Sequence, residues 1–250
     1  MLKSFMKLLF SFSNLFFLIF LITLTNLSVI YGQENKVLKT IYNAYDLILG
    51  EENLKLHQGP LFIDEYIVNN ENHRYYRSSN LIKGTVVYNG DVFFDQKIKY
   101  DLFEDKLLLN PKKSSETLIV ELIKTNVDSF SIKGKVFKIF KGNNLDLNIG
   151  YLEVIANESN SQLLKKNSKN NLGKTYRNIY YEFKPRYRYY VYHKKILSPF
   201  NSKSDVLALY PEQNKFIKQF FRGNKTLRKT NEDLFMQNLF LELNNKLINL

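Results

Sequence analysis

The pattern of hydrophobic and polar positions divides the chain into stretches with different periods. A stretch without any charged residue runs from Leu8 to Gln33. Over residues 35–49 the apolar side chains recur every three or four positions, which predicts one amphipathic helix. From Lys83 to Tyr192 they gather in short runs rich in Val, Ile, Phe and Tyr, which is typical of strands.

The clearest local signal in the strand region is Asn89-Gly90, between apolar runs at residues 84–88 and 92–100. This dipeptide suits a type I′ turn, which needs positive φ at both central positions, so we expect a β-hairpin. We expect a polar loop at residues 167–171. Further strands are expected at residues 106–109, 117–123, 127–133, 135–140, 149–156, 162–165, 176–183 and 186–192.

Because no long helical pattern separates these runs, the sequence predicts an antiparallel β-meander. After residue 200 the period becomes helical, with starts expected at Ser204, Pro211 and Thr230. The predicted fold class is therefore α+β, mainly β: a curved sheet or sandwich with one N-terminal helix and a C-terminal helical segment. The expected division is a signal peptide over residues 1–32, a β-rich domain over 33–200 and a helical tail over 201–250 packed on the sheet.

The uncharged N-terminal stretch follows Lys3 and Lys7 and has the features of a secretory signal peptide. Polar residues dilute its flanks, which favours a signal over a permanent bilayer-spanning helix. We expect cleavage after Gly32 and a periplasmic or secreted product; an uncleaved N-terminal anchor is the alternative.

Composition limits the partners and the chemistry. The chain has no cysteine, which excludes disulfides, a thiol nucleophile and a lipid-modified cysteine. Its net charge of +12 favours anionic partners. Export makes nucleic acid an unexpected partner, so we expect anionic polymers of the cell envelope or another envelope protein, with peripheral membrane contact as a further option. The charges are scattered along the sequence, which an ordinary solvated surface also explains.

Four segments resemble a group of uncharacterised exported proteins of Gram-negative bacteria: residues 83–91, 98–109, 127–134 and 204–220. The resemblance covers most of the mature chain and lies in structural motifs. It implies export and a meander with a helical tail, and it implies no activity.

One segment stands out as a candidate binding site, because residues 184–195 interleave cations with aromatic rings. In a strand, Arg186, Arg188, Tyr190 and Tyr192 share one face. Guanidinium groups beside rings suit sugars, phosphates or carboxylates. A half-buried strand with arginines at its wet end is the alternative interpretation.

Catalytic and metal-site motifs are weak. The acidic residues Asp101, Glu104 and Asp105 could act in acid–base chemistry but more simply form a turn. The three histidines have no metal-ligand spacing, and residues 144–148 only begin a calcium-loop pattern. We therefore expect no catalytic residues, metal or cofactor, and a non-enzymatic binding or scaffolding protein of the bacterial cell envelope. The alternatives are an apolar-ligand (lipid) carrier and an envelope hydrolase with paired carboxylates.

Overall fold

The structure is a computed structural model that describes residues 36–44, 55–68, 72–111, 115, 117–140, 149–158, 160–174 and 180–248. The chain forms two compact units, residues 1–50 and residues 51–250. In the first unit residues 36–44 are helical, within the helix predicted at 35–49. The predicted signal segment lies outside the described residues.

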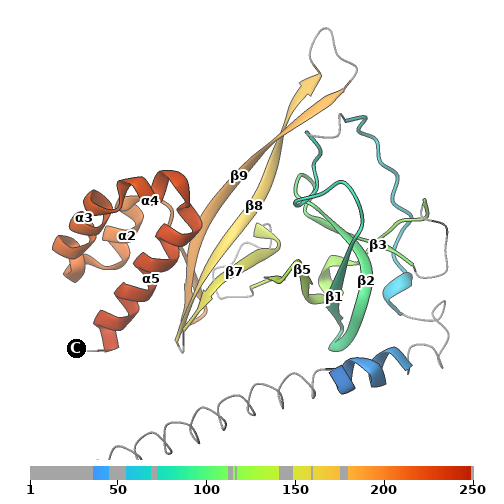
Figure 1. The fold of residues 1–250 in the computed structure, drawn as a ribbon, viewed down its shortest axis with the longest axis horizontal. Coiled ribbons are helices and arrows are strands. Elements are labelled where there is room, and N and C mark those ends of the chain that lie inside the picture. Colours follow the sequence, from blue (N-terminus) through green and yellow to red (C-terminus); the bar gives the residue numbers. More distant parts are fainter. Residues whose placement is uncertain are drawn as a thin grey trace, which may run out of the picture. The chain divides into compact units, whose positions relative to one another are not determined.

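The second unit contains one sheet of ten antiparallel strands, which confirms a mainly β fold (Figure 1). Chain neighbours are mostly sheet neighbours, as in a meander, except that β1 lies between β2 and β5; the order is β10-β9-β8-β7-β6-β5-β1-β2-β3-β4. The strands are β1 (Ile82–Tyr88), β2 (Asp91–Asp101), β3 (Lys106–Asn110), β4 (Val120–Glu121), β5 (Val127–Ile132), β6 (Lys135–Lys138), β7 (Leu152–Asn157), β8 (Ser161–Lys174), β9 (Tyr181–His193) and β10 (Ile196–Pro199).

The hairpin of β1 and β2 has the predicted turn. Asn89 and Gly90 have φ angles of 51° and 85°, as a type I′ turn requires. The Gly90 amide donates a hydrogen bond to Oδ2 of Asp128, 2.8 Å away on the neighbouring strand β5. Local sequence therefore determines this turn, and the hydrogen bond to β5 stabilises it.

The predicted polar loop at residues 167–171 is wrong, because β8 runs through it as a strand. It pairs with β9 from Ser161↔His193 to Lys174↔Tyr181. Residues of this stretch have partners elsewhere in the fold: the Asn167 side-chain amide donates to Glu153 at 2.7 Å, and the backbone amide of Lys169 donates to the carbonyl of Leu102 at 3.1 Å. Pairing with β9 and these distant contacts outweigh the local turn preference of asparagine.

Two other predicted element boundaries differ from the structure. Within residues 117–123 only β4 is a strand, and it pairs with β3 at just two positions. Strand β10 is not among the predicted strands; it forms a hairpin with the end of β9, with Lys194 and Lys195 at positive φ in the turn. These short strands are set by their neighbours rather than by their own pattern.

A first hydrophobic core fills the space along β1 to β6. Phe130 and Phe137 stack with ring centroids 4.8 Å apart, and Tyr100 packs edge-on against both. Tyr76 and Tyr151 belong to the same cluster and are almost completely buried. As the aromatic composition indicates, ring pairs across strands supply much of this core.

The C-terminal segment is helical and packs on the sheet. Its elements are α2 (Lys203–Leu209), the 3₁₀ turn η5 (Pro211–Gln213), α3 (Asn214–Gly223), α4 (Lys225–Thr230) and α5 (Glu232–Ile248). Helix α2 is capped by Ser202, two residues before the expected Ser204, and Asp205 completes a capping box. Pro211 begins a helical turn as expected.

A second core joins these helices to strands β7, β8 and β9. Phe235, Met236, Leu239 and Phe240 of α5 are fully buried in it. The sheet contributes four side chains to the same cluster: Ala156, Leu163, Tyr189 and Val191. Figure 1 shows the helices gathered beside the β8–β9 ribbon. The helical segment therefore shares one compact unit with the sheet.

Candidate functional site

The aromatic and cationic segment singled out in the sequence lies on β9, whose two faces have different environments. Tyr189 and Val191 point into the core shared with the helices, and the Tyr189 hydroxyl donates to Oδ1 of Asp233 on α5 at 2.5 Å. Arg186 and Arg188 alternate with these residues and are exposed. One face of β9 thus holds the helices, and the other presents two guanidinium groups.

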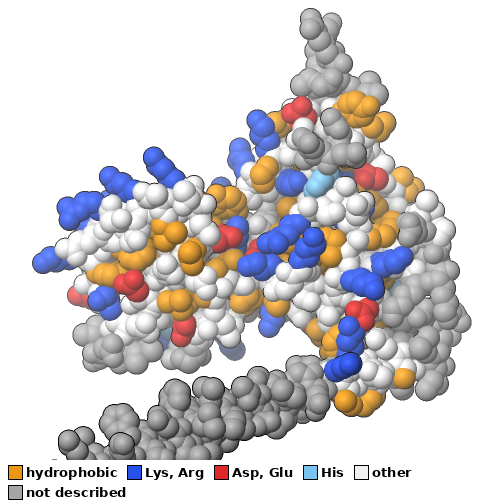
Figure 2. Space-filling model, viewed as in Figure 1, with side chains coloured by type: hydrophobic (Ala, Val, Ile, Leu, Met, Phe, Trp, Pro, Cys, Tyr) orange, Lys and Arg blue, Asp and Glu red, His pale blue; other side chains and the backbone are white. Residues whose placement is uncertain are grey.

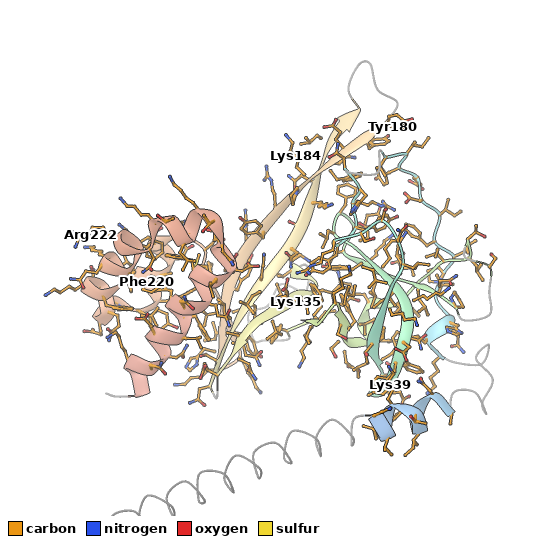
Figure 3. All side chains as sticks on the ribbon, in the orientation of Figure 1. Lys39, Lys135, Tyr180, Lys184, Phe220 and Arg222 are labelled. Atoms are coloured by element: carbon orange, nitrogen blue, oxygen red, sulfur yellow. The ribbon has the colours of Figure 1, made fainter. Side chains whose placement is uncertain are left out.

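The arginines lie where β9 is an edge strand. Strand β10 pairs only with Tyr190 to His193, so residues 184–188 have β8 on one side and no paired strand on the other among the described residues. Neither Arg186 nor Arg188 forms an ion pair with a carboxylate in the described part of the chain. On the same strand Lys184 projects outward (Figure 3). These cations are available to an external anion.

Strand β8 supplies the other half of the site. In the β8–β9 register Ser168 lies opposite Arg186, Lys166 opposite Arg188 and Asn170 opposite Lys184. Of these residues all but Lys184 line, together with Tyr190, a shallow groove of about 590 Å³, called the β8–β9 groove below. No carboxylate is among the described residues that line it: Ile149, Lys166, Ser168, Asn170, Pro185, Arg186, Tyr187, Arg188 and Tyr190.

The cations of the β8–β9 groove differ in whether a carboxylate of the protein neutralises their charge. Lys166 donates to Oδ1 of Asp105 at 2.6 Å, and burial lowers the pKa of its ammonium group while Asp105 opposes that shift. Lys166 therefore belongs to an internal ion pair. Arg186 and Arg188 carry the groove's uncompensated positive charge.

The tyrosines of the segment have three different roles. Tyr190 is half-buried and lines the groove, whereas the Tyr192 ring packs against Phe140 at 4.9 Å between centroids. Tyr187 donates its hydroxyl to Oε2 of Glu232 on α5 at 3.0 Å, and this hydrogen bond raises the pKa of the phenol. Of the four predicted site residues, the structure brings Arg186, Arg188 and Tyr190 together in the groove; Tyr192 packs instead against a neighbouring ring.

The sequence does not identify Ser168 and Asn170 as site residues, because its pattern predicts a loop at residues 167–171. The signal that could have identified them is the length of the cationic strand. A strand of thirteen residues needs a neighbouring strand of similar length, and β8 has fourteen residues. Pairing of that length places β8 residues opposite each arginine.

The acidic residues of the β2–β3 turn form ion pairs and hydrogen bonds within the protein. Asp101 is fully buried beside Arg74, and its Oδ1 accepts the backbone amides of Phe103 and Glu104. Burial raises the pKa of Asp101 to about 6, against the opposing effect of Arg74.

The neighbouring Asp105 is the centre of a second internal network. It accepts the Tyr100 hydroxyl at 2.5 Å and forms ion pairs with Lys124 and Lys166. Asp101 and Asp105 therefore connect the turn between β2 and β3 to different parts of the fold: Asp101 contacts Arg74, and Asp105 contacts Lys124 and Lys166. These contacts fit the simpler interpretation of the acidic cluster as a turn.

The remaining candidates from the sequence are the histidines and the calcium-like residues 144–148. In the described part of the chain no group of three or more histidine, aspartate and glutamate side chains is arranged to hold a metal ion. The calcium-like residues 144–148 lie outside the described residues. Among the helices that the structure describes, none is long and apolar enough to cross a bilayer.

Comparison of the chain with protein-family models, with curated proteins and with solved structures finds no match.

Proposed function

We propose that this is an exported, non-enzymatic binding protein of the bacterial cell envelope, and that its β8–β9 groove binds an acidic glycan. The observation that carries the proposal is the pair Arg186 and Arg188, two exposed guanidinium groups two residues apart in a groove whose described lining contains no carboxylate. Export rests on the N-terminal sequence pattern alone.

The chemistry of the groove favours a sugar acid over a free anion. Guanidinium groups form bidentate hydrogen bonds with carboxylate, sulfate or phosphate. Tyr190 offers a half-buried ring beside them, and Ser168 and Asn170 offer neutral hydrogen-bonding groups for hydroxyls. A sugar ring carrying an acidic substituent uses all three kinds of contact.

The test is the double substitution Arg186→Ala and Arg188→Ala. Binding to immobilised heparin and polygalacturonate, measured by surface plasmon resonance, should weaken at least about ten-fold, since each hydrogen bond to a charged group contributes roughly 1.5–3 kcal/mol. Both side chains are exposed, so the melting temperature should move by no more than about 2 °C.

A matched control removes the same charge from other strands. Lys83→Ala with Lys138→Ala replaces two exposed lysines on β1 and β6. This variant should retain the parental affinity within about two-fold. Equal weakening in both variants would show that only net charge matters, and unchanged binding by the arginine variant would remove the groove as the site.

A further inference from the structure

The structure gathers the positive charge that is scattered along the sequence. Figure 2 shows Lys and Arg side chains lining the rim of the helical part. On α3 the cations Lys215, Lys218 and Arg222 are three and four residues apart and share one side of the helix. The opposite side carries the buried Ile217, Phe220 and Phe221, so α3 is divided into a core face and a cationic face.

Helices α4 and α2 extend that surface. Lys225, Arg228 and Lys229 of α4, together with Lys203 at the start of α2, line the same depression of about 1010 Å³ as the three cations of α3. We call these seven side chains the helical cationic face. Glu232 is the single carboxylate in the described lining, and Oε1 of Glu232 lies 3.6 Å from Nε of Arg228.

Most of this charge is uncompensated. Arg228 is held by Glu232 and lies over the Phe221 ring, 5.3 Å from its centroid. The other six cations form no ion pair with the described residues, and all six are exposed. In Figure 3 Arg222 points away from the helices, whereas Phe220 lies among them. The face therefore attracts anions from solvent.

The chemistry of the face favours an extended array of anions over a single small ligand. Its volume is at the upper limit of pockets that enclose small molecules. Five of the seven cations are lysines, whose flexible, hydrated ammonium groups respond to charge density more than to shape. Gln219 is the one neutral polar side chain in the described lining, and Phe221 is covered by Arg228.

We infer that the helical cationic face docks the protein on a membrane surface through anionic lipid headgroups. Phosphate-bearing headgroups supply the dense array of negative charge that seven neighbouring cations recognise. The choice of a membrane over a soluble polyanion rests on the proposed export, because the uncharged N-terminal segment brings the chain to a membrane. This face lies on the helices and is distinct from the β8–β9 groove.

The test uses residues 33–250, the product of the predicted cleavage after Gly32. This product retains the whole compact unit of residues 51–250. Sedimentation with vesicles of phosphatidylglycerol and phosphatidylcholine at a ratio of about 1:2 should show binding that falls as salt rises, and vesicles of phosphatidylcholine alone should bind at least about ten-fold less. The triple substitution Lys218→Gln, Arg222→Gln, Lys225→Gln should weaken binding to the anionic vesicles on the order of 100-fold.

The control makes the same change of charge elsewhere, with Lys55→Gln, Lys83→Gln and Lys138→Gln, all three exposed. It should retain binding within about three-fold, because surface charges act mainly within a Debye length. Equal losses in the two triple variants, or binding to neutral vesicles as tight as to anionic ones, would overturn the inference. Tighter binding to soluble polyphosphate than to vesicles at equal phosphate concentration would assign the face to a free polymer instead. Failure of glycan binding leaves this test unaffected, since the β8–β9 groove is intact in both variants.

Discussion

The Nε atom of Arg74 lies 3.0 Å from Oδ2 of Asp101, and both side chains are buried. The two atoms form an ion pair, but their geometry does not meet that of a hydrogen bond. Asp64 and Glu104 approach the same guanidinium group at 3.2 Å and 3.4 Å. The Arg74 guanidinium also lies over the Tyr66 ring, 4.7 Å from its centroid. One arginine thus joins the segment before β1 to the turn after β2.

This arrangement predicts a defined pH dependence of stability. Burial raises the pKa of Asp101 to about 6, so between pH 4 and pH 6 the folded protein holds this proton more tightly than the unfolded chain. The contribution to stability is present below about pH 4 and is lost as pH rises through 6, with an upper limit of about 3 kcal/mol. The free energy of unfolding of the parent minus that of Asp101→Asn, measured in urea, should fall by up to that amount from pH 4 to pH 7.

The comparison isolates the carboxylate because asparagine keeps the side-chain oxygen that accepts the amides of Phe103 and Glu104. Asp91→Asn, an exposed position on β2, serves as the control and should follow the parent at every pH. Parallel curves for the parent and Asp101→Asn would contradict the prediction.

A second prediction concerns the contact that fixes α5 to the sheet. Asp233 Oδ1 accepts Lys165 Nζ at 2.7 Å and the Tyr189 hydroxyl at 2.5 Å. Burial opposes ionisation of Asp233, but these two hydrogen bonds outweigh burial and lower its pKa. Asp233→Ala should reduce the free energy of unfolding by about 2 kcal/mol at pH 7, because it leaves a lysine and a phenol without their shared acceptor.

Since the pKa of Asp233 is lowered, its contribution is present above the ordinary carboxylate range and is lost as pH falls below about 4. Guanidinium denaturation at pH 7 and pH 3 measures both effects. Glu242→Ala on the exposed side of the same helix should cost no more than about 0.5 kcal/mol. A loss at pH 3 as large as that at pH 7 would show that packing, and not the charge, is what Asp233 supplies.

A third prediction uses two glycines with the same backbone conformation. Gly134 and Gly150 have φ angles of 75° and 74°, so alanine is strained at both. A Cβ atom at Gly134 meets nothing within 4 Å, whereas one at Gly150 would clash with Oδ2 of Asp105. Gly134→Ala should cost about 1 kcal/mol.

Gly150→Ala should cost at least twice as much, because the added methyl group displaces Asp105 from Lys124 and Lys166. Differential scanning calorimetry of the two variants gives the comparison directly. Equal losses would mean that the Asp105 network tolerates displacement.

Local rules predicted those parts of the fold whose partners are close in sequence. The Asn89-Gly90 hairpin follows from positive φ at two adjacent positions, and Pro211 begins a helical turn because its φ is already helical. Strand β8 was not predictable in this way. Residues such as Asn167 form a strand because of β9 and Glu153, and a single-sequence pattern does not contain those contacts.

The same division applies to the candidate site. Strand alternation placed Arg186 and Arg188 together on one face, because that spacing is local. The contribution of Ser168 and Asn170 depends on the register between β8 and β9. The helical cationic face was hidden for a related reason: its seven residues are spread over twenty-seven positions and three helices, and only their packing brings them around one depression.

The short unpaired edge of β9 has a consequence for the behaviour of the protein in concentrated solution. An exposed strand edge can recruit a second chain and start aggregation. Here the five edge positions are Lys184, Pro185, Arg186, Tyr187 and Arg188, three cations and a residue without an amide hydrogen. Two copies that approached edge to edge would bring six like charges together, so the edge that presents the arginines also keeps neighbouring molecules apart.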